Sequence, residues 1–432
     1  MNDLMDTLLD LAAMPAGDLP LAPLESARNS LFDWVICGRA GIGEPVTQKM
    51  KDFMAIEGGA GIASVFGGGM APARMAAFVN GTISHAIDFD DTHFAHVGHL
   101  SVGIYPAALA AGEAVGAAQS QIIAAFLLGA EAAIRVGLVL GNGHYNRGFH
   151  QTATAGAFGA TVAAGRLMGL TREEMRMALG LCSTRASGLK SQFGTMGKPL
   201  NAGIAAANGI EAAQLARLGM TSCADGLMGA QGFIATHSDA PNPLVAPIGE
   251  WLFPAISYKF HACCHGTHAM IEALRAFLPI APETIEKITL RTNPRWLSVC
   301  NIPNPRTGLE VKFSYAWLAG MVLNGHDTGA FESYTDQVAA DAGLAEFASR
   351  VAVIGDERQS DMQAEGSVLL RDGTSLPFAY DLADGPAPNA LKDRLIAKAR
   401  ALLGEGAGAL DPVLSSADMP AATLGRLVRA GG

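Results

Sequence analysis

The chain has 432 residues, of which 50% are hydrophobic, 16% are charged and 6% are aromatic. This length can bury a large core and suggests two or three domains, and the composition excludes a disordered or fibrous protein. The net charge of −10 and the absence of a basic run argue against a nucleic-acid partner, because phosphate binding needs a surface of Lys and Arg.

The first residues of the chain argue against a secreted protein, and its most apolar span argues against a membrane protein. Acidic residues stand where a signal peptide would carry Lys or Arg, so we expect a cytoplasmic protein. They are Asp3, Asp6 and Asp10. The span from Ile122 to Leu140 contains Glu131 and Arg135, which indicate a buried helix and no membrane partner.

Six cysteines are scattered through the chain. They are Cys37, Cys182, Cys223, Cys263, Cys264 and Cys300. In a cytoplasmic protein we expect free thiols. The Cys263-Cys264-His265 run, with His268 nearby, invites a zinc or iron–sulfur site. An iron–sulfur cluster requires three or four spaced cysteines, however, and this arrangement lacks them.

The first part of the chain has the pattern of packed helices. Apolar residues recur at helical spacing from Leu4 to Phe53. The Gly-rich stretch from Gly58 to Gly69 lacks the Lys-Ser or Lys-Thr of a phosphate-binding loop and predicts a tight loop. Two helices of small residues are predicted over Ser101–Val115 and Ser120–Leu140, the second ended by Gly141-Asn142-Gly143.

Three further helix starts follow, and two of them bring a polar residue to a helix of small residues. His150 precedes an Ala/Gly-rich helix over Ala153–Gly169, and Lys198 lies in a Gly/Pro turn before another. Between them, Thr171 and Glu174 form a capping box that begins a helix ending near Ser183.

Beyond Leu252 the periodicity becomes mixed. The sequence predicts strands over Ile288–Arg291 and Val351–Ile354, a hairpin turning at Asp372-Gly373, and two helices over Ser314–Leu323 and Ala340–Ser349. A closing helix over Asn389–Leu403 is expected to return to the first domain. We therefore predict a mainly α protein, with a large all-helical domain of residues 1–256 and 386–432 and a smaller α+β domain of residues 257–385.

One stretch, Gly81 to Ser101, concentrates ionisable groups in a chain that otherwise has few charges. Its polar residues are His85, Asp88, Asp90, Asp91, Thr92, His93, His96 and His99. A solvated helix end could explain them, because Thr and Asp cap helices. A metal site is a second interpretation, but we expect no metal because no metal signature is present. The flanking segments are apolar, which favours a functional site.

The phrase from Asn80 to His93, NGTISHAIDFDDTH, resembles the signature of the MmgE/PrpD family. The phrase from Lys198 to Ala216 and the Tyr258-Lys259-Phe260 run are also similar to that family. Its known members include 2-methylcitrate dehydratase, cis-aconitate decarboxylase and iminodisuccinate epimerase. The resemblance implies a helical domain that carries most of the site, an α+β lid, and a homodimer.

The resemblance also implies a set of site residues on segments far apart in the chain. They are Asp88, Thr92, His99, His150, Lys198 and Lys259. Three departures from the family pattern matter. His96 rivals His99, because the alignment needs one extra residue before Ser101. Asn201 stands where relatives often have His. Trp317 stands where the family usually has Tyr, and Tyr315 is two residues away. Both are predicted to contact substrate, although indole cannot act as acid or base.

These residues make chemical sense together. Lysines and a histidinium hold the carboxylates of a di- or tricarboxylate, and a neutral His or Asp removes a proton next to a carboxylate. We expect a cofactor-independent lyase similar to 2-methylcitrate dehydratase. The alternatives are an epimerase of the iminodisuccinate type, a decarboxylase of cis-aconitate, a binding protein without activity and a metal-dependent hydrolase.

Overall fold

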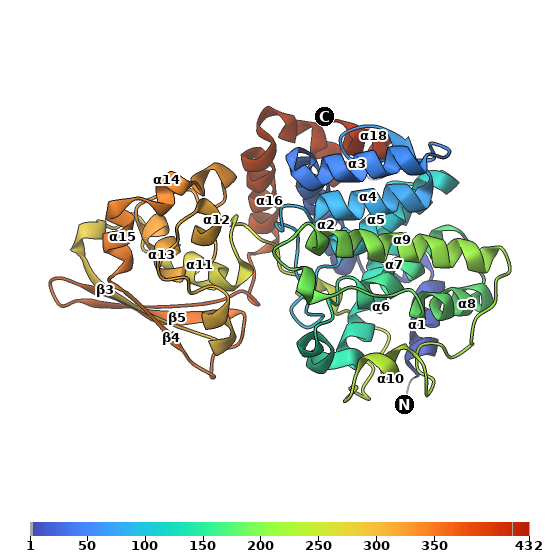
Figure 1. Ribbon diagram of the computed structural model, residues 1–432, viewed down its shortest axis with the longest axis horizontal. Coiled ribbons are helices and arrows are strands. Elements are labelled where there is room, and N and C mark those ends of the chain that lie inside the picture. Colours follow the sequence, from blue (N-terminus) through green and yellow to red (C-terminus); the bar gives the residue numbers. More distant parts are fainter. Residues whose placement is uncertain (1–2, 417, 432) are drawn as a thin grey trace. The chain divides into compact units, whose positions relative to one another are not determined.

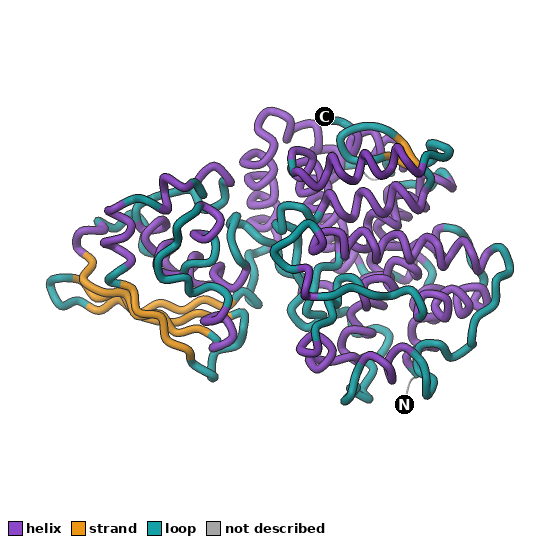
Figure 2. Tube along the Cα trace, in the orientation of Figure 1, coloured by secondary structure: helices purple, strands orange, loops and turns teal. Residues whose placement is uncertain are grey.

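The computed structural model describes residues 3–416 and 418–431, and the chain forms two units. The first unit comprises Met1–Tyr258 with Leu403–Gly432, and the second comprises Lys259–Leu402. The first is almost entirely helical, and the second combines helices with a four-stranded sheet (Figure 1 and Figure 2). The prediction of a mainly α protein with a smaller α+β domain is confirmed.

Twelve α-helices make up the described part of the first unit. They are α1 (Leu4–Ala13), α2 (Leu21–Ala40), α3 (Pro45–Glu57), α4 (Ala73–Ser84), α5 (Ser101–Val115), α6 (Gln119–Arg147), α7 (Thr154–Leu167), α8 (Arg172–Ser183), α9 (Gly197–Arg217), α10 (Phe233–His237), α17 (Asp411–Ser415) and α18 (Ala421–Arg429). Two short strands, β1 (Ala63–Ser64) and β2 (Met70–Ala71), pair beside them. The capping box at the start of α8 is confirmed, because Thr171 and Glu174 each bind the other's backbone N–H.

Small residues let the central helices of the first unit approach closely. An added Cβ on Gly203 of α9 would lie 2.3 Å from the carbonyl oxygen of Phe78 on α4. One on Gly81 of α4 would lie 2.8 Å from the Cα of Gly203. A hydrogen at both positions is therefore required for α4 and α9 to pack backbone against backbone.

The long helix α6 is apolar enough to span a membrane by length and composition, but 94% of its most apolar window is buried inside the protein. Its Glu131 and Arg135 form a buried ion pair. Glu131 accepts hydrogen bonds from the backbone N–H groups of Leu252 and Phe253, while Arg135 donates to carbonyl oxygens of the segment just before them. The two charges within α6 therefore hold the segment that leads toward residue 258.

The predicted end of this helix was wrong. At Gly141 the backbone leaves the helical conformation, with φ 68° and ψ −178°, but the helix resumes and runs to Arg147. Glycine accommodates this break because it has no Cβ to clash at positive φ. The predicted turn is thus a kink inside α6.

The second unit has a four-stranded sheet in the order β4-β3-β5-β6. Its strands are β3 (Ile285–Thr292), β4 (Val351–Gly355), β5 (Gln363–Leu370) and β6 (Ser375–Asp381). β3 and β4 are parallel, and the other pairs are antiparallel. The β5–β6 hairpin turns at Asp372-Gly373 as predicted, with Gly373 at φ 87°. The helices of this unit are α11 (His268–Arg275), α12 (Gly308–Val311), α13 (Tyr315–Leu323), α14 (Asp336–Ala339), α15 (Ala342–Ala348) and α16 (Pro388–Leu403).

The closing helix α16 belongs to the second unit up to Leu402, whereas the sequence pattern predicted that all of residues 386–432 belong to the helical domain. The part of that range from Leu403 onward does belong to the first unit. Arg394 of α16 forms an ion pair with Glu272 of α11, and its guanidinium lies 3.9 Å from the ring centre of Phe260. Both partners belong to the second unit. An amphipathic pattern shows that a helix has a buried face but does not show which neighbour buries it.

Replacing a helical glycine by alanine usually stabilises a protein, but the close packing of α4 on α9 predicts the opposite for Gly203. Gly203→Ala should lower the free energy of unfolding by roughly 1–3 kcal/mol, because the new methyl group meets the Phe78 carbonyl. Gly143→Ala is the matched control, since it is exposed in α6 with no atom within 4 Å, and it should stabilise by about 0.5–1 kcal/mol. Urea unfolding of both variants measures this difference, and equal stabilisation by both would contradict the close approach.

Candidate active site

Four of the predicted site residues lie at helix ends within the first unit. Asp88 follows the end of α4, and His99 lies two residues before α5. His150 lies four residues before α7, and Lys198 is the second residue of α9. The sequence predicted that Lys198 lies in a turn before its helix. In the structure Lys198 lies in the first turn of α9 itself.

Side-chain contacts tie these helix ends together. The backbone N–H of His99 donates to Thr152 Oγ1 at 2.9 Å, which links the start of α5 to the start of α7. Asn201 Nδ2 lies 3.1 Å from His150 Nδ1, which links α9 to the same point. Lys198 Nζ lies 2.5 Å from Asp88 Oδ2. The starts of three helices therefore meet, and their partial positive charges favour an anion there.

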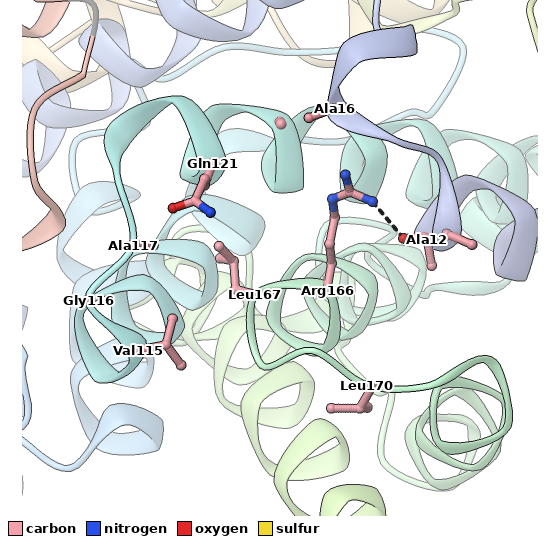
Figure 3. Close-up of a pocket in the computed structure, with 11 residues that line it drawn as sticks. Ala12, Ala16, Val115, Gly116, Ala117, Gln121, Arg166, Leu167 and Leu170 are labelled. Carbon is pink, nitrogen blue, oxygen red and sulfur yellow. Dashed lines mark hydrogen bonds between the residues drawn. The ribbon is translucent and has the colours of Figure 1, made fainter.

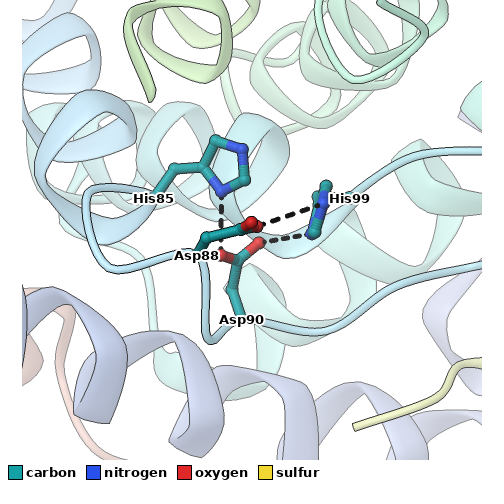
Figure 4. A group of neighbouring side chains, drawn as sticks. All are labelled: His85, Asp88, Asp90 and His99. Atoms are coloured by element: carbon teal, nitrogen blue, oxygen red, sulfur yellow. Dashed lines mark hydrogen bonds and ion pairs between the residues drawn. The ribbon is translucent and has the colours of Figure 1, made fainter. Parts of the chain in front are cut away.

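A buried carboxylate, Asp90, bridges two imidazoles (Figure 4). Its Oδ1 lies 2.8 Å from His85 Nδ1, and its Oδ2 lies 2.8 Å from His99 Nδ1. Burial alone would raise the pKa of Asp90, but His85 and His99 together hold this pKa well below its usual range. Asp90 is therefore a fixed negative charge behind His99.

The other ring nitrogen of His99 faces Asp88. His99 Nε2 lies 3.7 Å from Asp88 Oδ1 (Figure 4). The Asp88 side chain is 45% exposed, whereas that of Asp90 is fully buried. Asp88 also has φ 51°, a left-handed conformation that is uncommon outside glycine and occurs at functional sites. The turn after α4 therefore presents Asp88 toward both His99 and Lys198.

His150 is buried beside this group. Its ring lies 6.3 Å from that of His85, centre to centre, and packs edge-on against Phe193 at 5.0 Å. Burial, reinforced by the nearby His85 and Lys198, holds the pKa of His150 well below its usual range. His150 is therefore a neutral imidazole near pH 7, able to offer one N–H and one lone pair.

Asp91 lies next to this group but binds a different partner. Its carboxyl interacts with Ser101, whose Oγ lies 2.5 Å from Asp91 Oδ2. Burial, and then the nearby Asp33, raise the pKa of Asp91 to about 7. This carboxyl is therefore half protonated near neutral pH.

Two other predicted residues of the first unit have different surroundings. Thr92 exchanges backbone hydrogen bonds with Ser257 at 2.8 and 2.9 Å. His96 is fully buried against α6, where a Cβ on Gly137 would come within 2.7 Å of its Nδ1, and burial lowers its pKa to about 3. Of the two rivals, His99 is the one that the structure brings to Asp88.

The remaining predicted residues, Lys259, Tyr315 and Trp317, belong to the second unit. Lys259 is 3% exposed. The Tyr315 hydroxyl donates to the Gly266 carbonyl at 2.7 Å, and Trp317 Nε1 donates to the Val338 carbonyl at 3.0 Å. These contacts account for both aromatic side chains within the core of this unit, and their part in substrate binding stays a prediction.

Sequence reasoning gave no role to His85, Asp90 and Phe193. The first two lie in the charged stretch that the sequence singled out, so a signal for them existed. Phe193 had no such signal, because its place beside His150 depends on how the loop before α9 folds back.

Four donor side chains could hold a cation. They are His85, Asp88, Asp90 and His99, with one ligand atom from each within 4.8 Å of the others. The same atoms are engaged with protein partners, namely Lys198 for Asp88 and the two imidazoles for Asp90. A metal would have to displace the Lys198 ammonium from Asp88, so the donor set fits a hydrogen-bonded acid–base site better.

A separate hollow of about 710 Å³ lies at the ends of α1, α5 and α7 and the start of α6 (Figure 3). Apart from Gln121 and Arg166, its lining residues are apolar or glycine. Arg166 Nη1 donates to the Ala12 carbonyl at the end of α1, at 2.8 Å. The hollow contains none of the predicted site residues.

The raised pKa of Asp91 predicts a pH-dependent stability. The Asp91 carboxyl has a pKa of about 7 in the folded protein and an ordinary pKa of 3.8 in the unfolded chain. Between about pH 4 and 7 the folded protein therefore keeps a proton that the unfolded chain has released. The contribution of this carboxyl to the free energy of unfolding falls as the pH rises through that window. The free energy of unfolding of Asp91→Asn, relative to that of the wild type, should therefore rise by about 2–3 kcal/mol between pH 5 and pH 8. Urea unfolding at both pH values measures this gain, with the exposed Asp52→Asn as control, and a difference independent of pH would contradict it.

Comparisons with known proteins bear on this site. The chain matches the MmgE/PrpD N-terminal domain over residues 11–245 and the MmgE/PrpD C-terminal domain over residues 261–411. The second match includes all of α16, in agreement with the place of that helix in the second unit.

Relatives include cis-aconitate decarboxylase of Aspergillus terreus, which is 31% identical over 292 residues, 63% of this chain and 59% of the relative. The cis-aconitate decarboxylase-like protein oryM of Aspergillus oryzae is 31% identical over 277 residues, 60% of this chain and 58% of the relative. Human cis-aconitate decarboxylase is 30% identical over 276 residues, 59% of this chain and 56% of the relative. The chain thus spans less than two thirds of the length of these relatives. With both domains matched, the chain belongs to the MmgE/PrpD family.

Proposed function

We propose that this protein is a cofactor-independent lyase of a small di- or tricarboxylate, acting through a carbanion next to a carboxylate. The observation that carries the proposal is the meeting of Lys198, Asp88 and His99 where three helices begin. In a chain of net charge −10, a local cation and converging helix N-termini are what an anionic substrate requires.

Each group has a part in the chemistry. Lys198 has three N–H donors, so it can bind Asp88 and a substrate carboxylate at the same time. His99 exchanges a proton with a substrate carbon, and Lys198 with the N–H of His150 stabilises the charge that develops on the adjacent carboxylate. Lys259 is proposed as a second carboxylate clamp on the family resemblance alone, as are a cytoplasmic homodimer and a contact of Thr92 with substrate.

The names of the relatives favour the decarboxylation of cis-aconitate as the first reaction to test. This reaction consumes one proton for each CO2 lost, and the proton is delivered to carbon. Dehydration of 2-methylcitrate, which the sequence analysis placed first, and epimerisation of iminodisuccinate pass through similar carbanions and are the alternatives.

Proton NMR of the EDTA-treated protein in D2O separates these reactions. Cis-aconitate, 2-methylcitrate, citrate and iminodisuccinate are supplied in separate tubes. We expect cis-aconitate to give new vinylic signals of a five-carbon product with one deuteron in its methylene group. Vinylic signals from a hydroxy acid would instead establish a dehydratase, and α-deuteration without an alkene would establish an epimerase. Activity that is lost with EDTA and restored by a divalent metal would overturn the cofactor-independent mechanism.

Removal of the Lys198 ammonium tests the carboxylate clamp. Lys198→Met should lower kcat/KM by about 10- to 100-fold or more, since a hydrogen bond to a charged group contributes roughly 1.5–3 kcal/mol. Lys49→Met, at an exposed position on α3, is the matched control and should retain wild-type kinetics. Unchanged kinetics in Lys198→Met would remove this lysine from the site.

A further inference from the structure

We propose that the two site histidines are locked in opposite tautomers, His99 by the Asp91 carbonyl together with the Asp90 carboxylate and His150 by Asn201, so that His99 exchanges a proton at Nε2 and His150 is a hydrogen-bond donor. This inference rests on the proposed function for its chemical meaning, but the tautomers themselves are properties of the protein alone. Asp90 and Asn201 are positioning residues, because each acts through an imidazole.

The surroundings of His99 Nδ1 place a hydrogen on that atom. Nδ1 lies 2.8 Å from Asp90 Oδ2 and 2.7 Å from the backbone carbonyl oxygen of Asp91. Both oxygens can only accept, so Nδ1 must be the nitrogen that carries the hydrogen. In neutral His99 the lone pair is therefore on Nε2, the atom that faces Asp88.

Asp90 is itself held in place by a second imidazole. His85 Nδ1 lies 2.8 Å from Asp90 Oδ1 and forms a hydrogen bond with it, and the side chains of His85 and Asp90 are both fully buried. This second contact orients the carboxylate and favours its ionised form. When His99 gains a proton, Asp90 is the charge that stabilises the imidazolium.

The surroundings of His150 lead to the opposite tautomer. Asn201 Nδ2 lies 3.1 Å from His150 Nδ1 and 3.3 Å from the backbone carbonyl of Leu189. The Leu189 oxygen can only accept, which identifies the amide nitrogen of Asn201 as the atom that faces both partners. The amide donates to His150 Nδ1, so the hydrogen of neutral His150 is on Nε2.

Opposite tautomers divide the work between the two rings. His99 exchanges a proton with the substrate carbon through Nε2. As an imidazolium it delivers the proton that decarboxylation consumes, and as a neutral ring its lone pair takes a proton in dehydration or epimerisation. The N–H of His150 donates to the carboxylate oxygen on which negative charge develops. A neutral imidazole is a suitable donor there, because it stabilises the charge without titrating near pH 7. Asn201 also stands where the sequence resemblance expects His, so this chain fixes His150 with a residue that has no titratable group.

The first experiment reads the tautomers directly in the free enzyme. Two-bond proton–nitrogen NMR of protein labelled with ¹⁵N-histidine distinguishes Nδ1–H from Nε2–H rings, and His99→Gln and His150→Gln assign the two signals. We expect Nδ1–H for His99 and Nε2–H for His150 at pH 8. Identical tautomers, or the reverse pair, would overturn the proposal whether or not any substrate is turned over.

Isosteric variants then test the locks. Asn201→Asp replaces the donor by an acceptor and should switch His150 to Nδ1–H, with a fall in kcat of at least 10-fold and little change in KM. Asn208→Asp, on the same helix with its amide donating to the Arg185 carbonyl, is the matched control and should leave the His150 signal unchanged. A switched tautomer with unchanged kcat would overturn the role of His150 as the donor.

Asp90→Asn tests the surroundings of His99. It should lower the pKa of His99 by about one unit or more, because an anion within hydrogen-bond distance of Nδ1 is removed. NMR titration of the His99 ring measures this shift. The acid limb of the kcat/KM profile should move by the same amount. Asp91→Asn serves as control, since its carboxyl binds Ser101 rather than a histidine, and should shift the pKa of His99 less. Equal shifts in the two variants would contradict the assignment to Asp90.

If the wild-type enzyme is inactive on every acid tested while the tautomers are as expected, the proposed substrates fail and the tautomer locks stand. If the wild-type enzyme is active but the tautomers differ from those expected, the proposed function stands and the tautomer locks fail. The two proposals are therefore judged by separate measurements.

Discussion

The site depends first on the backbone contact between α4 and α9. Gly81 and Gly203 let the two helices approach until an added methyl group would overlap a carbonyl oxygen. This contact brings the turn after α4, which carries Asp88, to the first turn of α9, which carries Lys198. Small residues on α5 and α7 extend the same close packing, so the starts of three helices converge on one turn. The chemistry of the site is thus set by a steric constraint several residues away from it.

Charge in this site is arranged in layers of different burial. Asp90 is fully buried, with Oδ1 hydrogen-bonded to His85 and Oδ2 in an ion pair with His99, whereas Asp88 is half exposed and paired with Lys198. Burial makes an unpaired charge very costly, so the deep carboxylate needs both of its imidazoles, whereas the shallower one stays partly exposed and needs only a lysine. His99 therefore has a fixed negative charge, Asp90, on one side of its ring, and Asp88 with its Lys198 partner on the other.

The second unit contributes a different kind of residue. Tyr315 and Trp317 direct their polar atoms to backbone carbonyls within the unit, as buried aromatic residues usually do. Lys259 follows Tyr258, whose hydroxyl is hydrogen-bonded to Ser30 in the first unit, so Lys259 marks the point where the chain passes from one unit to the other. The α16 helix returns the chain, and its Arg394 is held by Glu272.

Local patterns in the sequence predicted much of this protein. The capping box at Thr171, the Asp372-Gly373 hairpin and the buried nature of α6 all depend on neighbours within a few positions, where propensity and periodicity act. Contacts between distant segments were decided only by the tertiary structure. These include the choice of His99 over His96, the bond of Asn201 to His150, the place of Phe193 and the unit to which α16 belongs. Such contacts depend on which helix faces which and at what distance, and a linear pattern carries no information about that geometry until the core has packed.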